Sequence, residues 1–363
     1  MKIDRVDVQA VVQPYQDKSW QFALASRKET HGLIIRLRTD DGPDGIAYAT
    51  AALHVGEVLG GMRQLVDEVF TPILVGGDPF DIEALMGRID AAVLGYPKTK
   101  AAIEVALFDA VGKALGVPLY KLWGGLYRAS IPVIRIIPIK EPADMARNAE
   151  RVVAEGYRYL KIKVGHDARK DVERVREIRR AVGPDIGLTL DANQGWGTPK
   201  LAIDALRRME EFDVALIEQP VRADDFQGLA TVKAGVSTIV EADESAGSVV
   251  DIYQLARGGF VDAVSLKTPK LGGPRNVKKA AAICQAANLR CRMGMGGANR
   301  LISAVDMHLI ASTPNIDYAC EVGEFSRMDS DPTTGVEIVD GMLWVPHLPG
   351  HGASIAPDVA FGA

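Results

Sequence analysis

From about residue 131 the sequence alternates between short apolar runs of strand length and amphipathic stretches of helix length. Eight runs have strand character: residues 131–137, 159–164, 187–193, 215–220, 238–243, 263–268, 289–293 and 317–322. Such alternation predicts parallel strands that are joined by crossover helices. The pattern therefore favours a modified (β/α)8-type TIM barrel, with an open doubly wound α/β sheet as the alternative.

The residues before this region predict a different unit. Strand patterns at residues 2–11, 32–39 and 45–50 precede helical patterns at residues 55–74, 81–94 and 98–115. Strands followed by helices are typical of an α+β domain. We therefore expect an N-terminal α+β capping domain at 1–128 and a barrel domain at 129–325. We expect the C-terminal segment, 326–363, to return to the cap.

Charge and composition narrow the classes of function. The formal net charge of −5 predicts no basic surface for nucleic acid or for an anionic membrane. The sequence shows no apolar run of about 20 residues that could span a bilayer, and its start does not resemble a signal peptide. The three cysteines, Cys284, Cys291 and Cys320, are too few for a disulfide framework and indicate buried thiols. These features predict a cytoplasmic protein that acts on a small molecule.

Charged residues end five successive strand patterns of the predicted barrel. They are Lys163, Asp191, Glu218, Asp243 and Lys267, at steps of 28, 27, 25 and 24 residues. A near-constant step is expected for equivalent positions in successive strand–helix units. Barrel enzymes carry their chemistry at the carboxyl ends of their strands. The five groups are therefore expected to surround one mouth of the barrel.

The three acids of this series predict a metal site. Carboxylate oxygens are the ligands that Mg²⁺ and Mn²⁺ prefer, with the remaining positions left to water or substrate. Three carboxylates placed close together repel one another, and either protonation or a cation must relieve that repulsion. The alternative is that each acid lies on a solvated loop.

The lysines lie before and after the acids in the chain. Lys161 and Lys163 are two residues apart, so both side chains leave the same face of their strand. The second and sixth strands lie on opposite sides of a closed barrel, so Lys163 and Lys267 would face a bound substrate from two sides. Neighbouring cations predict a lowered lysine pKa, which a lysine needs to act as a base near neutral pH.

Several motifs together resemble the enolase superfamily, in particular the muconate-lactonizing branch of the mandelate racemase/muconate lactonizing enzyme family. The motifs are Lys161-Ile-Lys163, Asp191-Ala-Asn193, Glu218-Gln219-Pro220, Ala242-Asp243-Glu244-Ser245 and Lys267. The resemblance also includes the N-terminal cap and Pro349-Gly350-His351-Gly352, and thus covers nearly the whole chain.

The resemblance implies a divalent-metal-dependent isomerase. Such an enzyme removes the proton α to a substrate carboxylate, and the metal stabilises the enediolate that forms. The resemblance makes Lys163 and Lys267 the acid/base residues and Lys161 an electrostatic aid. It makes the three acids the ligands of Mg²⁺ (or Mn²⁺), and Asn193 and Glu244 the neighbours that hold them. Relatives commonly form homo-oligomers, and the same is expected here.

The specific reaction is less constrained. The seventh-strand segment, residues 289–296, has no histidine, which favours the chemistries that use two lysines. These are cycloisomerisation, N-acylamino-acid racemisation, dipeptide epimerisation and o-succinylbenzoate synthesis. Glu321 stands where dipeptide epimerases show Asp-x-Asp, and it favours a muconate-type cycloisomerase. A non-catalytic ligand-binding barrel is the alternative from another class, although all five strand-end charges are intact.

Four residues are candidates for substrate binding. Trp20 and His54 lie in cap segments that close over the substrate in the family. Arg135 on the first barrel strand could meet a second substrate carboxylate, or could instead pair with an acid for structural reasons. Glu321 lies at the end of the eighth strand pattern.

Overall fold

The computed structural model describes residues 1–53, 56–357, 359 and 361. Its main body is a parallel sheet of seven strands in the order β13-β12-β11-β10-β9-β8-β7, so each new strand pairs with the one before it. The strands are β7 (Ile134–Ile137), β8 (Tyr159–Lys163), β9 (Gly187–Asp191), β10 (Val214–Glu218), β11 (Ile239–Ala242), β12 (Ala263–Leu266) and β13 (Arg290–Met293). The predicted barrel with an N-terminal cap is confirmed.

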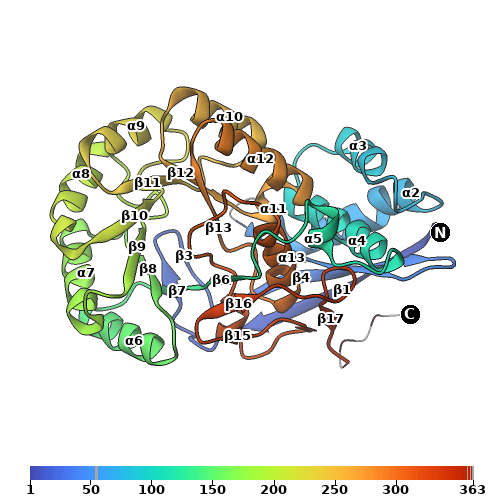
Figure 1. The fold of residues 1–363 in the computed structure, drawn as a ribbon, viewed down its shortest axis with the longest axis horizontal. Coiled ribbons are helices and arrows are strands. Elements are labelled where there is room, and N and C mark those ends of the chain that lie inside the picture. Colours follow the sequence, from blue (N-terminus) through green and yellow to red (C-terminus); the bar gives the residue numbers. More distant parts are fainter. Residues whose placement is uncertain (54–55, 358, 360, 362–363) are drawn as a thin grey trace.

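Figure 1 shows the sheet curling within a layer of helices. The helices that follow the strands are α6 (Pro142–Ala154), α7 (Ala168–Val182), α8 (Pro199–Arg207), α9 (Phe226–Gly235), α10 (Val249–Gly258), the short α11 (Thr268–Leu271), α12 (Pro274–Ala286) and α13 (Arg300–Ala311). A short 3₁₀ turn, η3 (Glu210–Phe212), precedes β10. Apolar residues at helical spacing pack against the sheet, and the resulting core is continuous with that of the cap.

Two of the predicted strands differ in the structure. Residues 317–322 do not form a regular strand, because this segment bonds to its two neighbours at separate points. The Ile134 amide donates to the Cys320 carbonyl and the Glu321 amide donates to the Met293 carbonyl, both at 2.9 Å. The segment thus closes the barrel between β13 and β7 without a continuous ladder.

The predicted strand at residues 131–137 is split. Its start is β6 (Ser130–Pro132), which pairs antiparallel with β16 (Met342–Trp344), and only its end belongs to β7. Pro132 has no amide hydrogen for a ladder, and its carbonyl accepts the Cys320 amide at 3.0 Å.

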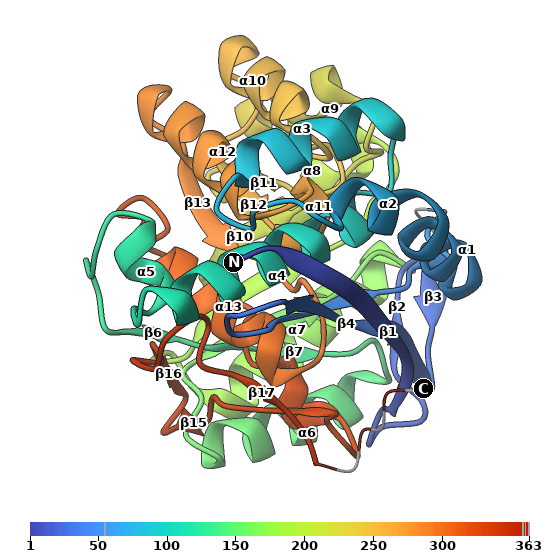
Figure 2. The ribbon, with the colours of Figure 1, turned by 90° about the vertical axis from the view of Figure 1, so that its right-hand side faces the viewer.

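The cap contains an antiparallel sheet in the order β1-β4-β5, formed by β1 (Ile3–Pro14), β4 (Glu29–Thr39) and β5 (Gly45–Thr50). Figure 2 shows this sheet and helix α4 on the side of the molecule that faces the viewer. The other elements are α1 (Leu59–Leu65), the π-helical turn η2 (Val66–Phe70), α2 (Thr71–Leu74), α3 (Ile82–Ala92), α4 (Pro97–Ala114) and α5 (Leu119–Leu122). Helix α4 lies so close to β5 that a side chain at Gly45 would collide with the Ala106 carbonyl.

A small hairpin of the cap contacts the barrel. Strands β2 (Gln21–Phe22) and β3 (Ala25–Ser26) form it, and the Ile139 amide donates to the Gln21 carbonyl at 3.0 Å. The Phe22 ring centroid lies 5.6 Å from Nζ of Lys163. The hairpin therefore covers the carboxyl end of β8.

The C-terminal segment returns to the cap. It includes η4 (Glu324–Arg327), β14 (Thr333–Thr334), β15 (Ile338–Val339), β16 and β17 (Ser354–Ile355). His351 is buried, and its amide donates to Oδ1 of Asp109 on α4 at 3.2 Å. Because Nδ1 of His351 accepts the Ala353 amide at 3.0 Å, its Nε2 carries the hydrogen and donates to the Ile46 carbonyl at 3.0 Å.

All three cysteines are buried and free, as predicted. None of the helices in the described ranges is long and apolar enough to cross a membrane.

Candidate active site

The strand-end charges predicted from the sequence meet at one edge of the barrel sheet. Lys163 pairs in register with Asp191, and Asp191 pairs with Glu218, so these residues follow one another on β8, β9 and β10. Asp243 and Lys267 directly follow β11 and β12. Since the sheet keeps chain order, the acids form a row with Lys163 at one end and Lys267 at the other.

Lys161 is the buried centre of this cluster, with an exposed fraction of 1%. Its Nζ lies 2.8 Å from Oδ2 of Asp191, 2.6 Å from Oε2 of Glu218 and 2.8 Å from Oε1 of Glu321. Burial opposes the charged form of Lys161, but the three carboxylates outweigh it and hold the Lys161 pKa well above its ordinary value.

Lys163 is held by two groups of the next strand and its loop. Its Nζ donates to Oδ2 of Asp191 at 2.5 Å and to Oδ1 of Asn193 at 2.8 Å. Asn193 has a φ of 39°, and in this left-handed conformation its amide donates to Oδ1 of Asp191 at 2.8 Å. Its Nδ2 donates to Oε1 of Glu244 at 3.1 Å. Asn193 and Glu244 thus contact the cluster, and their role as neighbours that hold metal ligands stays a prediction.

Asp243 lies at the other end of the row between two lysines. Lys267 contacts its Oδ2, and Nζ of Lys270 lies 2.8 Å from its Oδ1. Burial would raise the Asp243 pKa, but the two ammonium groups hold it well below its usual value. Gln219 fixes the Asp243 backbone, because Oε1 of Gln219 accepts the amides of Asp243 and Ser245, each at 3.0 Å.

The lysine pKa values differ from the sequence-based expectation. The sequence predicted lowered values, from the repulsion of neighbouring cations. Burial does disfavour the charged form of Lys267, but Asp243 and Glu218 outweigh it and raise the Lys267 pKa. Lys161 behaves in the same way. Carboxylates, and not other cations, are the nearest charges to both ammonium groups.

The donor set of the row fits a hard divalent cation in its chemistry. Asp191, Glu218 and Asp243 offer carboxylate oxygens from three adjacent strand ends, and Oε1 of Glu218 is buried without a hydrogen-bond partner. Burial and Asp191 raise the Glu218 pKa, which reflects the repulsion that a cation would relieve. In the described ranges, however, no three His, Cys, Asp or Glu side chains are close enough to share one ion, because each of these acids is turned onto a lysine.

Arg292 forms a second layer of charge below this row. Its Nε donates to the two carboxylate oxygens of Glu241 at 3.2 and 3.1 Å, and its Nη1 lies 2.7 Å from Oε1 of Glu321. It also contacts Oε2 of Glu218, the oxygen that Lys161 touches. Arg292 is 1% exposed and Glu241 fully buried, so this ion-pair group lies inside the barrel.

The four substrate-binding candidates have different outcomes. Glu321 joins the cluster, where Lys161 and Arg292 overcome the effect of burial and lower its pKa to about 2. Trp20 is buried, its ring is stacked on Tyr15 with a centroid distance of 6.0 Å, and the Arg327 guanidinium covers it at 3.6 Å. His54 lies outside the described residues.

Arg135 is not brought to the cluster. It pairs in register with Leu160, whereas its neighbour Ile136 pairs with Lys161. Because successive side chains of a strand alternate between faces, Arg135 points to the face opposite Lys161. There its Nη1 donates to Oγ of Ser326 at 2.5 Å, and its guanidinium lies over the Tyr157 ring.

Sequence reasoning missed several residues that contact the cluster. They are Gln219, Glu241, Lys270 and Arg292. Gln219 lies in a motif already singled out, and Lys270 follows Lys267 at one helical turn. Charged residues at alternate positions within the fifth and seventh strand patterns would have indicated Glu241 and Arg292 as interior groups.

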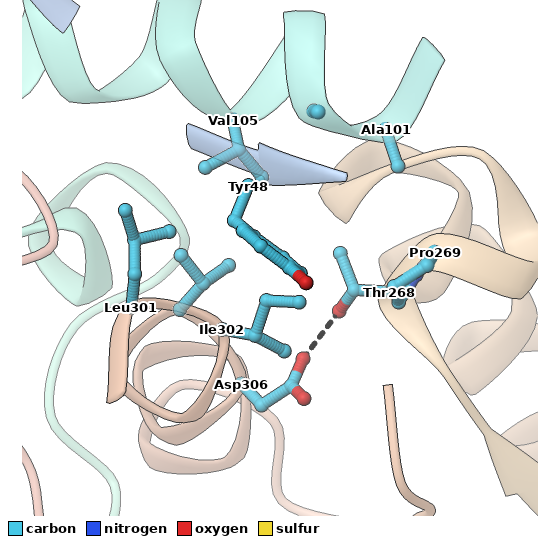
Figure 3. A pocket seen from close by; sticks show the side chains of 10 residues that line it. Tyr48, Ala101, Val105, Thr268, Pro269, Leu301, Ile302 and Asp306 are labelled. Carbon is cyan, nitrogen blue, oxygen red and sulfur yellow. Dashed lines mark hydrogen bonds between the residues drawn. The ribbon is translucent and has the colours of Figure 1, made fainter. Parts of the chain in front are cut away.

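A small cavity lies at the seam between cap and barrel, and Thr268, the residue after Lys267, is among its lining residues (Figure 3). Tyr48 of β5 and Ala101 and Val105 of α4 line it from the cap. From the barrel side, Oγ1 of Thr268 donates to Oδ1 of Asp306 at 2.6 Å. Burial raises the Asp306 pKa to about 7. The residue that follows Lys267 is therefore held by a buried acid.

The barrel, its cap and the row of lysines and carboxylates define a barrel enzyme of the enolase type. The chain belongs to the mandelate racemase/muconate lactonizing enzyme family of the enolase superfamily. Residues 144–359 match the model described as enolase C-terminal domain-like, and residues 5–124 match the N-terminal domain of mandelate racemase/muconate lactonizing enzyme. The predicted membership is confirmed.

Three relatives illustrate the range of activities in this family. The chain is 30% identical to the N-succinyl-L-Arg/Lys racemase of Bacillus cereus, over 94% of this chain and 97% of that protein. It is similar to the dipeptide epimerase of Enterococcus faecalis complexed with Mg and L-Leu-L-Tyr, with a TM-score of 0.93, 33% identity and coverage of 98% and 100%. The muconate lactonizing enzyme of Pseudomonas fluorescens complexed with muconolactone gives a TM-score of 0.93, 28% identity and coverage of 98% and 97%.

Proposed function

We propose that this isomerase of the enolase superfamily moves the proton α to a carboxylate in an N-acylated amino acid or a dipeptide, as a racemase or epimerase. The observation that carries the proposal is the position of Lys163 and Lys267 at opposite ends of one row of acids. Two amines placed in this way can serve the two faces of one carbon atom. The similarity to a racemase and a dipeptide epimerase supports the same reaction class.

Asp191, Glu218 and Asp243 would hold Mg²⁺, the ion present in the similar dipeptide epimerase complex. When bound, the ion supplies positive charge beside the substrate carboxylate and stabilises the negative charge that develops there. For the carboxylates to turn toward a shared ligand, the lysine ammonium groups must leave the oxygens that they now contact.

The lysines of the chain carry the proton. Nζ of Lys163 or Lys267 in its neutral form takes the α-proton, and the opposite ammonium returns a proton to the other face. Lys161 stays charged between three carboxylates and adds positive charge next to the reacting carboxylate. Asn193 and the Phe22 ring hold Lys163 in place and cover it from solvent.

Exchange of the α-proton tests this proposal. In deuterated buffer with Mg²⁺, the wild-type protein should exchange the α-proton of N-acyl amino acids or dipeptides of either configuration, followed by NMR. Lys163→Ala and Lys267→Ala should each abolish racemisation, and each should retain exchange for one enantiomer only. The absence of exchange across N-acyl amino acids and dipeptides would refute the proposal.

A muconate-type cycloisomerase is the second candidate. Glu321 supports it, since a glutamate at the end of the eighth strand resembles those enzymes, and so does the similarity to the muconate lactonizing enzyme. Conversion of muconate to muconolactone by the wild-type protein, measured by absorbance, would favour this candidate. The division at residues 128 and 325 and the homo-oligomeric state stay predictions.

A further inference from the structure

The first turn of helix α4 of the cap is capped by the carboxylate of a residue that lies about 40 positions earlier in the chain. Its N-cap residue, Tyr96, has a left-handed φ of 52° and makes no side-chain cap. Glu57 takes this role: its carboxylate accepts the amides of Lys98 and Thr99 at 2.9 and 3.0 Å and the Thr99 hydroxyl at 2.8 Å. Glu57 is 1% exposed, so these bonds fix where the first turn of α4, and with it Lys98, begins.

Lys98 lies on the face of α4 that meets the barrel. Ala101 and Ala102 follow it at three and four residues, a spacing that places all three on one side of the helix. Both alanines line the cavity at the seam together with Thr268 and Pro269 of α11, and Figure 3 shows Ala101 facing Pro269. Lys98 thus lies one helical turn before Ala101 and Ala102, which line the cavity together with the residues that directly follow Lys267.

The charges around Lys98 leave its ammonium without a close counter-ion. Its side chain is half-buried, and no carboxylate of the described residues forms an ion pair with it. Burial, together with the positive charges of Lys267 and Arg27, lowers the Lys98 pKa to about 8, although Glu57 and Asp243 oppose this. Asp243 cannot neutralise Lys98, because Lys267 and Lys270 already contact both of its oxygens.

We propose that Lys98 binds a second anionic group of the substrate, so that the substrate class is a dicarboxylate: an N-acyl amino acid or dipeptide with a carboxylate beyond the one next to the reacting carbon. This inference rests on the proposed racemase or epimerase function. A carboxylate between the cap and Lys267 would relieve the repulsion between the two cations. Lys98 would then select substrates by their charge.

Two probes that differ in one group test the inference. N-succinyl-L-phenylalanine carries the second carboxylate, and N-butanoyl-L-phenylalanine has a methyl group in its place. With Mg²⁺ present, calorimetry should show that the wild-type protein binds the succinyl probe more tightly. Lys98→Met should weaken binding of that probe by about 10- to 100-fold, as expected for a lost hydrogen bond between charged groups, and leave the butanoyl probe unchanged.

Lys98→Arg keeps the charge and should recover part of the preference, and the exposed Lys200→Met should have no effect. In turnover, the loss in Lys98→Met should lie in KM for the succinyl probe and not in kcat. Equal affinity of the wild-type protein for both probes, failure to bind either, or an equal loss for both in Lys98→Met would overturn the inference. Failure to exchange the α-proton would instead refute the proposed function, since calorimetry does not depend on turnover.

Discussion

Arg292 and Glu241 form a buried ion pair inside the barrel, with Nε of Arg292 at 3.2 and 3.1 Å from the two oxygens of Glu241. The same guanidinium contacts Glu218 and Glu321, so it joins the fifth strand to the fourth and to the segment that closes the barrel. One side chain therefore contacts three carboxylates, two of which also contact Lys161.

Removal of Arg292 should be strongly destabilising. Arg292→Met leaves three buried carboxylates short of a positive charge, and we expect a loss of about 3–5 kcal/mol in the free energy of unfolding. The double variant Glu241→Leu with Arg292→Met removes both partners and should lose less than the sum of the single variants. Urea unfolding of the four proteins of this cycle measures the coupling. Additive losses would show that the two side chains act independently.

Removal of divalent metal should abolish activity and leave the fold intact. After dialysis against EDTA, α-proton exchange should stop, and Mg²⁺ or Mn²⁺ should restore it. Glu218→Gln should weaken Mn²⁺ binding at least 10-fold, measured by electron paramagnetic resonance, because a neutral amide replaces a charged ligand. The exposed Asp185→Asn is the matched control. Full exchange without any divalent ion would contradict the assignment of the three acids.

Asp306 should make stability depend on pH. Burial raises its pKa to about 7, above the ordinary value of 3.8, so unfolding releases a proton between these values. The stability of the wild-type protein relative to Asp306→Asn should therefore fall as the pH rises from about 4 to about 7, and stay level above. Between pH 5 and pH 8 the expected change is about 2–3 kcal/mol, read from urea unfolding.

The exposed Asp185→Asn should show no such trend relative to wild type. If the difference between Asp306→Asn and wild type stayed constant over this pH range, Asp306 would have an ordinary pKa in the folded protein.

Gly165 brings the loop after Lys163 close to the loop after Asp191. It has a φ of 113°, and a Cβ atom there would lie 2.5 Å from the Ala192 carbonyl oxygen. Gly165→Ala should therefore cost more than the backbone strain of about 1–3 kcal/mol and should also reduce turnover. Gly183 is a matched control, since it has a φ of 76° with open space around it. Equal losses in urea unfolding for both variants would show that the close approach is unimportant.

The sequence alone predicted the barrel and the row of charged residues at the carboxyl ends of its strands. Constant steps between strand ends identify equivalent positions without knowledge of the loops, and this places Lys163, Asp191 and Glu218 on neighbouring strands. The face on which Arg135 lies depends on the register with β8, and no local pattern reports that register. The position of Lys98 near the barrel depends on the packing of α4 beside α11, which brings together segments far apart in the chain.

Glu241 and Arg292, the charged residues inside the barrel, were missed for a second reason. Glu241 interrupts an apolar strand pattern, and Arg292 follows Arg290 at an alternate position of its strand. A single buried charge inside a barrel is unfavourable. Only the pair is acceptable, and the two members are 51 residues apart. A search for lone motifs does not detect partners at such a separation.

The bonds of His351 to the cap have a consequence for biosynthesis. Helix α4 and Asp109 leave the ribosome long before His351, which follows 242 residues later. During translation, Asp109 of the cap therefore lacks its hydrogen bond from His351 until the whole barrel has been synthesised. A nascent chain halted before that point would contain every lysine and carboxylate of the site. Its cap would still lack the hydrogen bonds from His351 to Asp109 and Ile46.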